Sequence, residues 1–207
     1  MAIVVVGGHS RNIGKTSVMA GLIAALPAYR WTAFKITQSL ESHGSPSSEL
    51  RDCAPRDQCW SITEEQDESG KTDSSRFLRA GAERAYWVRV EPGRLQDALP
   101  AIQLKMAAAE NVIMESNSIL RFLDPDLYIT VLDPSTEDFK ASAENYLGRA
   151  DALVLHESRN PTPRWKQVTP EMLEGRPVFR IAPPDYVSGG LVGFVEDQLN
   201  RKRSSRP

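Results

Sequence analysis

The strongest constraint on the fold is a short apolar run near the start of the chain that stops at two glycines. Residues Ile3 to Val6 are all β-branched, and an unbroken run of this kind is typical of a strand buried on both faces. After Gly14, residues 15–26 carry apolar side chains at helical spacing, and Pro27 ends the pattern. A strand, a glycine-rich turn and a helix in this order predict a phosphate-binding loop.

The turn reads Gly-Gly-His-Ser-Arg-Asn-Ile-Gly-Lys-Thr-Ser over residues 7–17. Its last glycine, Lys15 and Thr16 fit the standard motif, but the standard spacing places the first glycine at position 9, which is His9. We therefore expect a variant loop in which backbone N–H groups bind phosphates, Lys15 contacts the terminal phosphates and the Thr16 hydroxyl ligates Mg²⁺. The candidate nucleotide-binding residues are Gly8, Asn12, Ile13, Gly14, Lys15, Thr16 and Ser17.

Two other loop residues and the identity of the base are less constrained by the sequence. Arg11 is either a second cation over the phosphates or a solvated arginine, and His9 is expected to shape the loop rather than act as a base. The Asn-Lys-x-Asp motif that confers guanine specificity in many GTPases is absent from residues 154–160. The sequence therefore does not distinguish GTP from ATP.

A carboxylate for the metal is expected at the end of a neighbouring strand. The apolar run 112–114 ends in Glu115, which we predict to ligate Mg²⁺ together with Thr16, because Mg²⁺ keeps several waters and takes few protein ligands. Asn117 and Ser118 follow at a place where a substrate or the γ-phosphate is within reach. Asp133, after the next strand, is a weaker alternative that could simply belong to a turn.

The rest of the chain alternates between strand and helix patterns, which predicts an α/β fold with a mostly parallel sheet and helices on both faces. We expect a single domain over residues 1–207, with a polar excursion at about 37–72 and a frayed basic tail at about 201–207. The expected strands are 3–6, 31–36, 86–90, 111–115, 127–132, 152–155 and 178–181. The expected helices are 15–26, 73–80, 96–109, 137–147 and 191–199, with Asp73 as the cap of the second.

Composition narrows the class of protein further. The 207 residues carry a formal net charge of −2, which argues against a protein that coats nucleic acid. No apolar run approaches the ~20 residues that cross a bilayer, so a cytoplasmic protein is expected. Cys53 and Cys59 lie in the polar excursion with His43, and they are either free thiols or part of a zinc site that a symmetric dimer would complete.

Three segments together resemble a known family. Residues 33–37 place Lys35 near the end of the second strand, residues 73–82 read Asp-Ser-Ser-Arg-Phe-Leu-Arg-Ala-Gly-Ala, and Glu115 ends a later strand. In this order they resemble the P-loop NTPase family of the molybdopterin-guanine-dinucleotide biosynthesis adaptor, MobB, over about residues 3–130. The chain departs from that pattern at Ile36, where the family has His, at Ser116, where it has Gly, and in a longer segment after Asp133.

The resemblance implies Mg²⁺-dependent binding and slow hydrolysis of GTP or ATP, a partner protein of molybdenum cofactor biosynthesis, and a homodimer. It implies catalytic roles for Lys15, Lys35 and Glu115, and gives Asp73 and Arg76 a role in organising the site; the alternative for these two is a helix cap and a surface ion pair. The dethiobiotin synthetase branch, an ATP-dependent synthetase of a small metabolite, is the second resemblance. Its Lys-Pro after the second strand is absent here.

Overall fold

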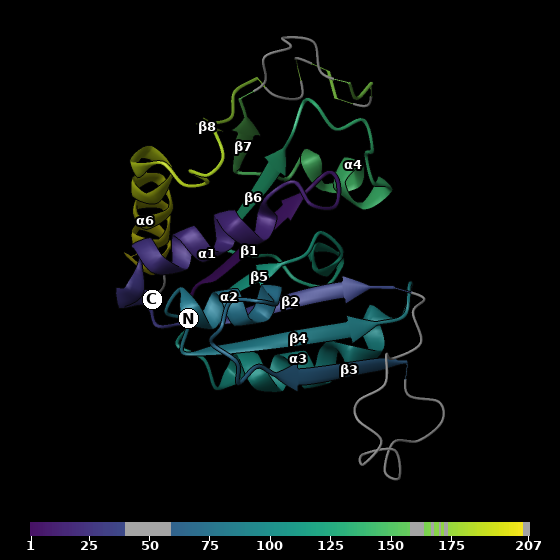
Figure 1. The fold of residues 1–207 in the computed structure, drawn as a ribbon, viewed down its shortest axis with the longest axis vertical. Coiled ribbons are helices and arrows are strands. Elements are labelled where there is room, and N and C mark those ends of the chain that lie inside the picture. The colour runs from purple at the N-terminus through teal and green to yellow at the C-terminus, as the bar shows by residue number, and fades with distance from the viewer. Residues whose placement is uncertain (40–58, 158–163, 167, 170, 172–173, 205–207) are drawn as a thin grey trace.

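The computed structural model describes residues 1–39, 59–157, 164–166, 168, 169, 171 and 174–204. They form an eight-stranded sheet with helices on both faces (Figure 1). The strands are β1 (Ile3–Gly8), β2 (Trp31–Gln38), β3 (Trp60–Glu64), β4 (Arg84–Val90), β5 (Asn111–Glu115), β6 (Leu127–Leu132), β7 (Ala152–His156) and β8 (Val178–Ile181). The helices are α1 (Lys15–Ala25), α2 (Asp73–Arg79), α3 (Leu95–Ala107), α4 (Ala141–Leu147) and α6 (Gly189–Ser204), with 3₁₀ turns at Pro27–Tyr29 and Ser118–Arg121.

The strand order is β3-β4-β2-β5-β1-β6-β7-β8, and every neighbouring pair is parallel except β3 and β4. β1 lies inside the sheet between β5 and β6, which explains why its apolar run is continuous. The prediction of a mostly parallel α/β sheet is confirmed. In such sheets the carboxyl ends of the strands meet at one edge, where ligands bind.

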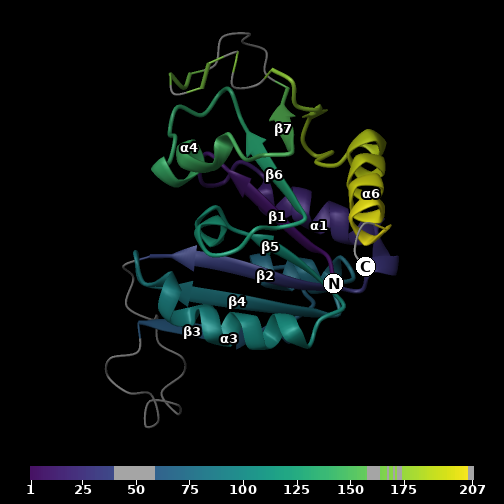
Figure 2. The same cartoon turned by 180° about the vertical axis from the view of Figure 1, so that it is seen from behind.

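The two faces of the sheet carry separate apolar clusters. Val4 and Val6 of β1 pack with α1, α2 and α6, whereas Val5 points to the opposite face, which α3 and α4 cover. Figures 1 and 2 show these two layers from opposite sides. Among the described residues, no helix is both long and apolar enough to span a membrane.

The strand β3 lies at residues 60–64, inside the expected polar excursion, where no strand is predicted. This edge strand pairs antiparallel with β4, and its Trp60 and Ile62 side chains pack toward α3 while Ser61 and Thr63 alternate with them. Only two apolar residues mark it, so the surrounding polar composition hid the pattern. Cys59, just before β3, is buried and its thiol donates to Asp97. Cys53 and His43 lie outside the described residues.

Two helices differ from their expected bounds by four or more residues at one end. α4 begins at Ala141 rather than 137, because the preceding residues extend toward the glycine-rich turn and the Lys140 N–H donates to the His9 carbonyl at 2.8 Å. α6 extends to Ser204, four residues into the expected frayed tail.

Thr72, and not Asp73, caps α2: its hydroxyl accepts from the Ser75 N–H, and the Ser75 hydroxyl accepts from the Thr72 N–H in return.

Candidate functional site

The glycine-rich turn between β1 and α1 has the backbone of a tight loop. Asn12 and Gly14 have φ angles of 57° and 84°, both in the left-handed region. A Cβ at Gly14 would lie 2.5 Å from the ring of Tyr186, so this position also lacks room for a side chain. Gly14 caps α1 with no side chain of its own, which leaves the first N–H groups of the helix facing the turn.

Lys15 bends back over this turn. Its Nζ donates to the Ser10 carbonyl at 2.5 Å, and burial lowers its pKa to about 8. The positive charges of Lys140 and Lys35 act in the same direction, whereas Glu115 opposes them. A lysine held in this way lacks a full counter-charge, and a bound anion would supply it.

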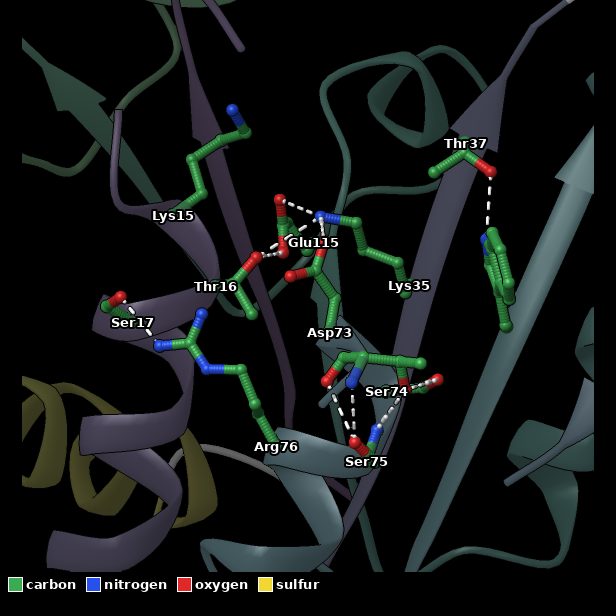
Figure 3. Close-up of polar contacts among 12 residues, drawn as sticks. Lys15, Thr16, Ser17, Lys35, Thr37, Asp73, Ser74, Ser75, Arg76 and Glu115 are labelled. Atoms are coloured by element: carbon green, nitrogen blue, oxygen red, sulfur yellow. Dashed lines mark hydrogen bonds and ion pairs between the residues drawn. The ribbon is translucent and has the colours of Figure 1, made fainter. Parts of the chain in front are cut away.

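Four side chains meet beside the first turn of α1 (Figure 3). The Thr16 hydroxyl donates to Glu115 Oε2 at 2.6 Å, and Lys35 Nζ lies 2.5 Å from Glu115 Oε1. The same ammonium lies 2.8 Å from Asp73 Oδ2 and 3.2 Å from Thr16 Oγ1. We call these residues, Thr16, Lys35, Asp73 and Glu115, the acidic corner.

The fold explains how the acidic corner forms. Lys35 and Glu115 are register partners on the adjacent parallel strands β2 and β5, so their side chains leave the sheet edge together. Because Thr72 caps α2, the Asp73 carboxylate is not used at the helix end and reaches Lys35. The Glu115 side chain is 4% exposed and that of Asp73 is 46% exposed, so the two ion pairs of Lys35 differ in solvation.

The residues after β5 and in α2 hold the turn from outside. Asn117 accepts from the Gly8 N–H and donates to the Gly8 carbonyl, each at 2.9 Å. Arg76 donates to the Ser17 hydroxyl at 2.8 Å. Asn117 and Ser118, which were expected within reach of a substrate or the γ-phosphate, both line the adjoining cleft, and the Asn117 amide also braces the turn.

A cleft of about 990 Å³ runs along this edge of the sheet. It brings together every predicted site residue except Ile13, whose side chain is buried in the core and whose carbonyl contacts His156 Nε2 at 2.9 Å. Six of its lining residues are not marked by any sequence motif, namely Gln38, Ser39, Trp87, Lys140, Ser142 and Tyr186. They come from separate segments of the chain, so no local signal identifies them.

His9 and Asp133 have structural positions. The His9 ring is fully buried, with Nδ1 2.7 Å from the Asp138 carbonyl and Nε2 3.0 Å from the Asp133 nitrogen. The Asp133 carboxylate accepts from Ser135 and Thr136, as in a turn, and does not line the cleft. Within the described part of the chain, no group of three or more His, Cys, Asp or Glu side chains is placed to hold a metal ion. A metal at the acidic corner would therefore rest on two carboxylates and a hydroxyl.

No protein-family model and no curated protein matches this chain. Solved structures do. HypB from Helicobacter pylori in complex with nickel aligns with a TM-score of 0.52 at 14% identity, covering 98% of this chain and 88% of HypB. LpxK from Aquifex aeolicus in complex with ATP aligns with a TM-score of 0.48 at 19% identity, covering 87% of this chain and 53% of LpxK. The likeness to HypB shows that this chain has the fold of P-loop NTPases.

Proposed function

We propose that this protein binds a nucleoside triphosphate with Mg²⁺ and hydrolyses it slowly. The observation that carries the proposal is the acidic corner, in which the first hydroxyl of α1 and two carboxylates surround one cation beside the glycine-rich turn. The turn and the start of α1 supply N–H groups for phosphates, and Lys15 supplies a charge.

The acidic corner fits a magnesium ion by its chemistry. Hydroxyl and carboxylate oxygens are the ligands that Mg²⁺ prefers, and here they already surround the ammonium of Lys35 as a stand-in cation. Thr16 and Glu115 would hold the metal, with Asp73 beside them, and the metal would neutralise charge on the terminal phosphates. The Lys35 ammonium would then leave the oxygens of Thr16, Asp73 and Glu115 and contact a phosphate oxygen or a substrate group instead.

Slow turnover follows from the same contacts. Phosphoryl transfer depends mainly on positioning and charge neutralisation. Asp73 and Glu115 are the carboxylates that line the described cleft, and with nucleotide bound both would be engaged at the metal in place of Lys35. Neither would therefore be free to orient a water molecule, so we expect turnover to need a partner or a second substrate.

The finer assignment is a MobB-like accessory role in molybdenum cofactor biosynthesis, as a homodimer with a partner protein. Its support is that the 73–82 segment, which carries the resemblance, contacts the nucleotide site at two points. Asp73 pairs with Lys35, and Arg76 donates to Ser17 at the start of α1. A nucleotide-dependent change in the proteins that co-purify with this chain would support this role.

The alternative is an ATP-dependent synthetase or kinase of a small metabolite. The cleft continues past the acidic corner to residues 37–39 and to Trp87, whose indole N–H donates to the Thr37 hydroxyl at 3.0 Å. This part of the cleft lies beyond the turn and offers room for a second substrate. Hydrolysis that is stimulated by a small carboxylate or hydroxyl compound would favour the alternative.

The test is nucleotide binding by the variant Lys15→Ala. Calorimetry with ATP and GTP, each with and without MgCl₂, should detect binding by the parent and a loss of at least about 100-fold in the variant, since a charge-assisted contact and a buried charge are both removed. Lys71→Met is the matched control, because Lys71 is exposed and does not line the cleft. Equal binding by Lys15→Ala and the parent would contradict the proposal.

A further inference from the structure

His9 occupies the position of the first glycine of the standard motif, and its side chain contacts a segment on the far side of the turn. Both ring nitrogens of His9 are engaged by backbone groups of the segment 133–138, and the ring stacks on Phe139 at 5.0 Å between centroids. The Ser10 hydroxyl adds a bond of 2.6 Å to the Asp138 carboxylate. The turn and the segment 133–140, which are distant in sequence, are thus joined at the position that departs from the motif.

This junction sets the position of Lys140. Its N–H donates to the His9 carbonyl at 2.8 Å, and its side chain lines the same cleft as Arg11 and Lys15. Neither Arg11 nor Lys140 forms a salt bridge with any described residue. Burial lowers the pKa of Lys140, and the charge of Arg11 lowers it further. Three cations therefore converge on one part of the cleft, and their repulsion favours a polyanion there.

The position of Lys140 along the cleft points to one end of that polyanion. Besides Arg11 and the opposing charge of Asp138, its ammonium is influenced by Lys35 and by Glu115 of the acidic corner, where the terminal phosphates would lie. We propose that Lys140, positioned by His9, joins Arg11 and Lys15 as the third cation of the terminal-phosphate site, and that it makes the protein bind nucleoside triphosphates more tightly than diphosphates. This inference rests on the proposed function and adds to it a residue from outside the loop and α1.

The experiment compares Lys140→Met with Lys140→Arg and with the one-charge control Lys71→Met. Dissociation constants are measured by calorimetry for ATP, ADP, GTP and GDP with MgCl₂. For Lys140→Met we expect triphosphate affinity to fall about tenfold and diphosphate affinity less than about twofold, as for the loss of one charge-assisted contact. Lys140→Arg should keep most of the discrimination, and Lys71→Met should keep all of it.

A double-mutant cycle tests the positioning role of His9. If His9 acts through Lys140, then Lys140→Met should change the ratio of triphosphate to diphosphate affinity in the parent and leave it unchanged in a His9→Ala background. A purely structural role of His9 would lower stability without this coupling. If His9→Ala fails to fold, the single Lys140 variants still decide the main proposal.

The outcomes separate this inference from the proposed function. If the parent binds nucleotide, Lys15→Ala does not, and Lys140→Met keeps the parent ratio of triphosphate to diphosphate affinity, then this inference alone is wrong. An equal loss of affinity for triphosphates and diphosphates would also overturn it. If the parent binds none of the four nucleotides, both proposals fail.

Discussion

The two sides of the glycine-rich turn differ in how their charges are balanced. In the acidic corner, Lys35 is within 2.8 Å of both carboxylates, so each charged group has a counter-charge within the protein itself. On the opposite side, Arg11, Lys15 and Lys140 line the cleft as cations that repel one another. The acidic corner should therefore govern the stability of the free protein, and the cationic side should govern its affinity for an anion.

The largest effect on the acidic corner is expected from Glu115→Gln. The variant keeps the shape of the side chain but removes the buried charge opposite Lys35, which is itself only 13% exposed. Lys35 then keeps only the Asp73 carboxylate, which is 46% exposed, as a counter-charge, so the free energy of unfolding should fall by about 2 kcal/mol, less than the ~3–5 kcal/mol for a buried charge left with no partner. Urea denaturation of the nucleotide-free protein measures this loss. A loss below about 1 kcal/mol would mean that the ion pair between Lys35 and Glu115 does not govern the stability of the free protein.

Replacing the cation itself gives the next largest effect. In Lys35→Met, the oxygens of Thr16, Asp73 and Glu115 have no ammonium between them, so MgCl₂ without nucleotide should bind there and stabilise the variant. At about ten times its dissociation constant the metal would add about 1.4 kcal/mol, or roughly 3–6 °C in Tm. The parent, in which Lys35 competes for these oxygens, should gain much less. An equal gain in both proteins would show that Lys35 and the metal do not compete.

On the cationic side, lowering the pH tests whether His9, which contacts the segment that carries Lys140, is buried in its neutral form. Burial lowers the pKa of His9 below 6.5, against the opposing effects of the Asp138 carbonyl and the Asp133 charge; the charge of Lys15 lowers it further and that of Asp138 raises it. Below pH 6.5 the unfolded chain binds a proton that the folded chain does not, so this contribution to stability is lost as the pH falls toward the folded pKa. The slope is at most about 1.4 kcal/mol per pH unit. Urea denaturation of the parent and His9→Gln between pH 7.5 and 5 should show the smaller slope in His9→Gln, and equal slopes would contradict a buried neutral His9.

The comparison also separates what the sequence could predict from what it could not. The acidic corner rests on residues at fixed distances from strand ends and helix starts, so Thr16, Lys35 and Glu115 could be identified before the structure. Parallel register then brings them together. The cap at Thr72 and the Lys35–Asp73 pair were not foreseen, because a Thr and an Asp in succession are both good helix caps and only the tertiary contact decides between them.

The cationic side carries no local pattern. Lys140 lies on a segment whose sequence pattern predicts a helix starting at 137, and its role depends on a contact between residues 9 and 140. The departure at His9 was visible in the sequence, but the partner segment was not. The position where the motif glycine is missing is thus the position where the turn is held by contacts with residues distant in sequence. In the same way, the edge strand at residues 60–64 could not be predicted because the residues around it are polar.

The smallest predicted effect is that of Asp73→Asn, which is the matched partner of Glu115→Gln. Both variants remove one carboxylate charge from the same ammonium, at 2.8 Å for Asp73 and 2.5 Å for Glu115. Since the Asp73 side chain is 46% exposed, water and salt screen its pair, and the free energy of unfolding should fall by less than about 1 kcal/mol. The loss should shrink further at high salt, whereas that of Glu115→Gln should not. Losses of equal size and equal salt dependence would mean that burial does not set the strength of the two pairs, and the buried pair could then not be singled out as the contact that governs the stability of the acidic corner.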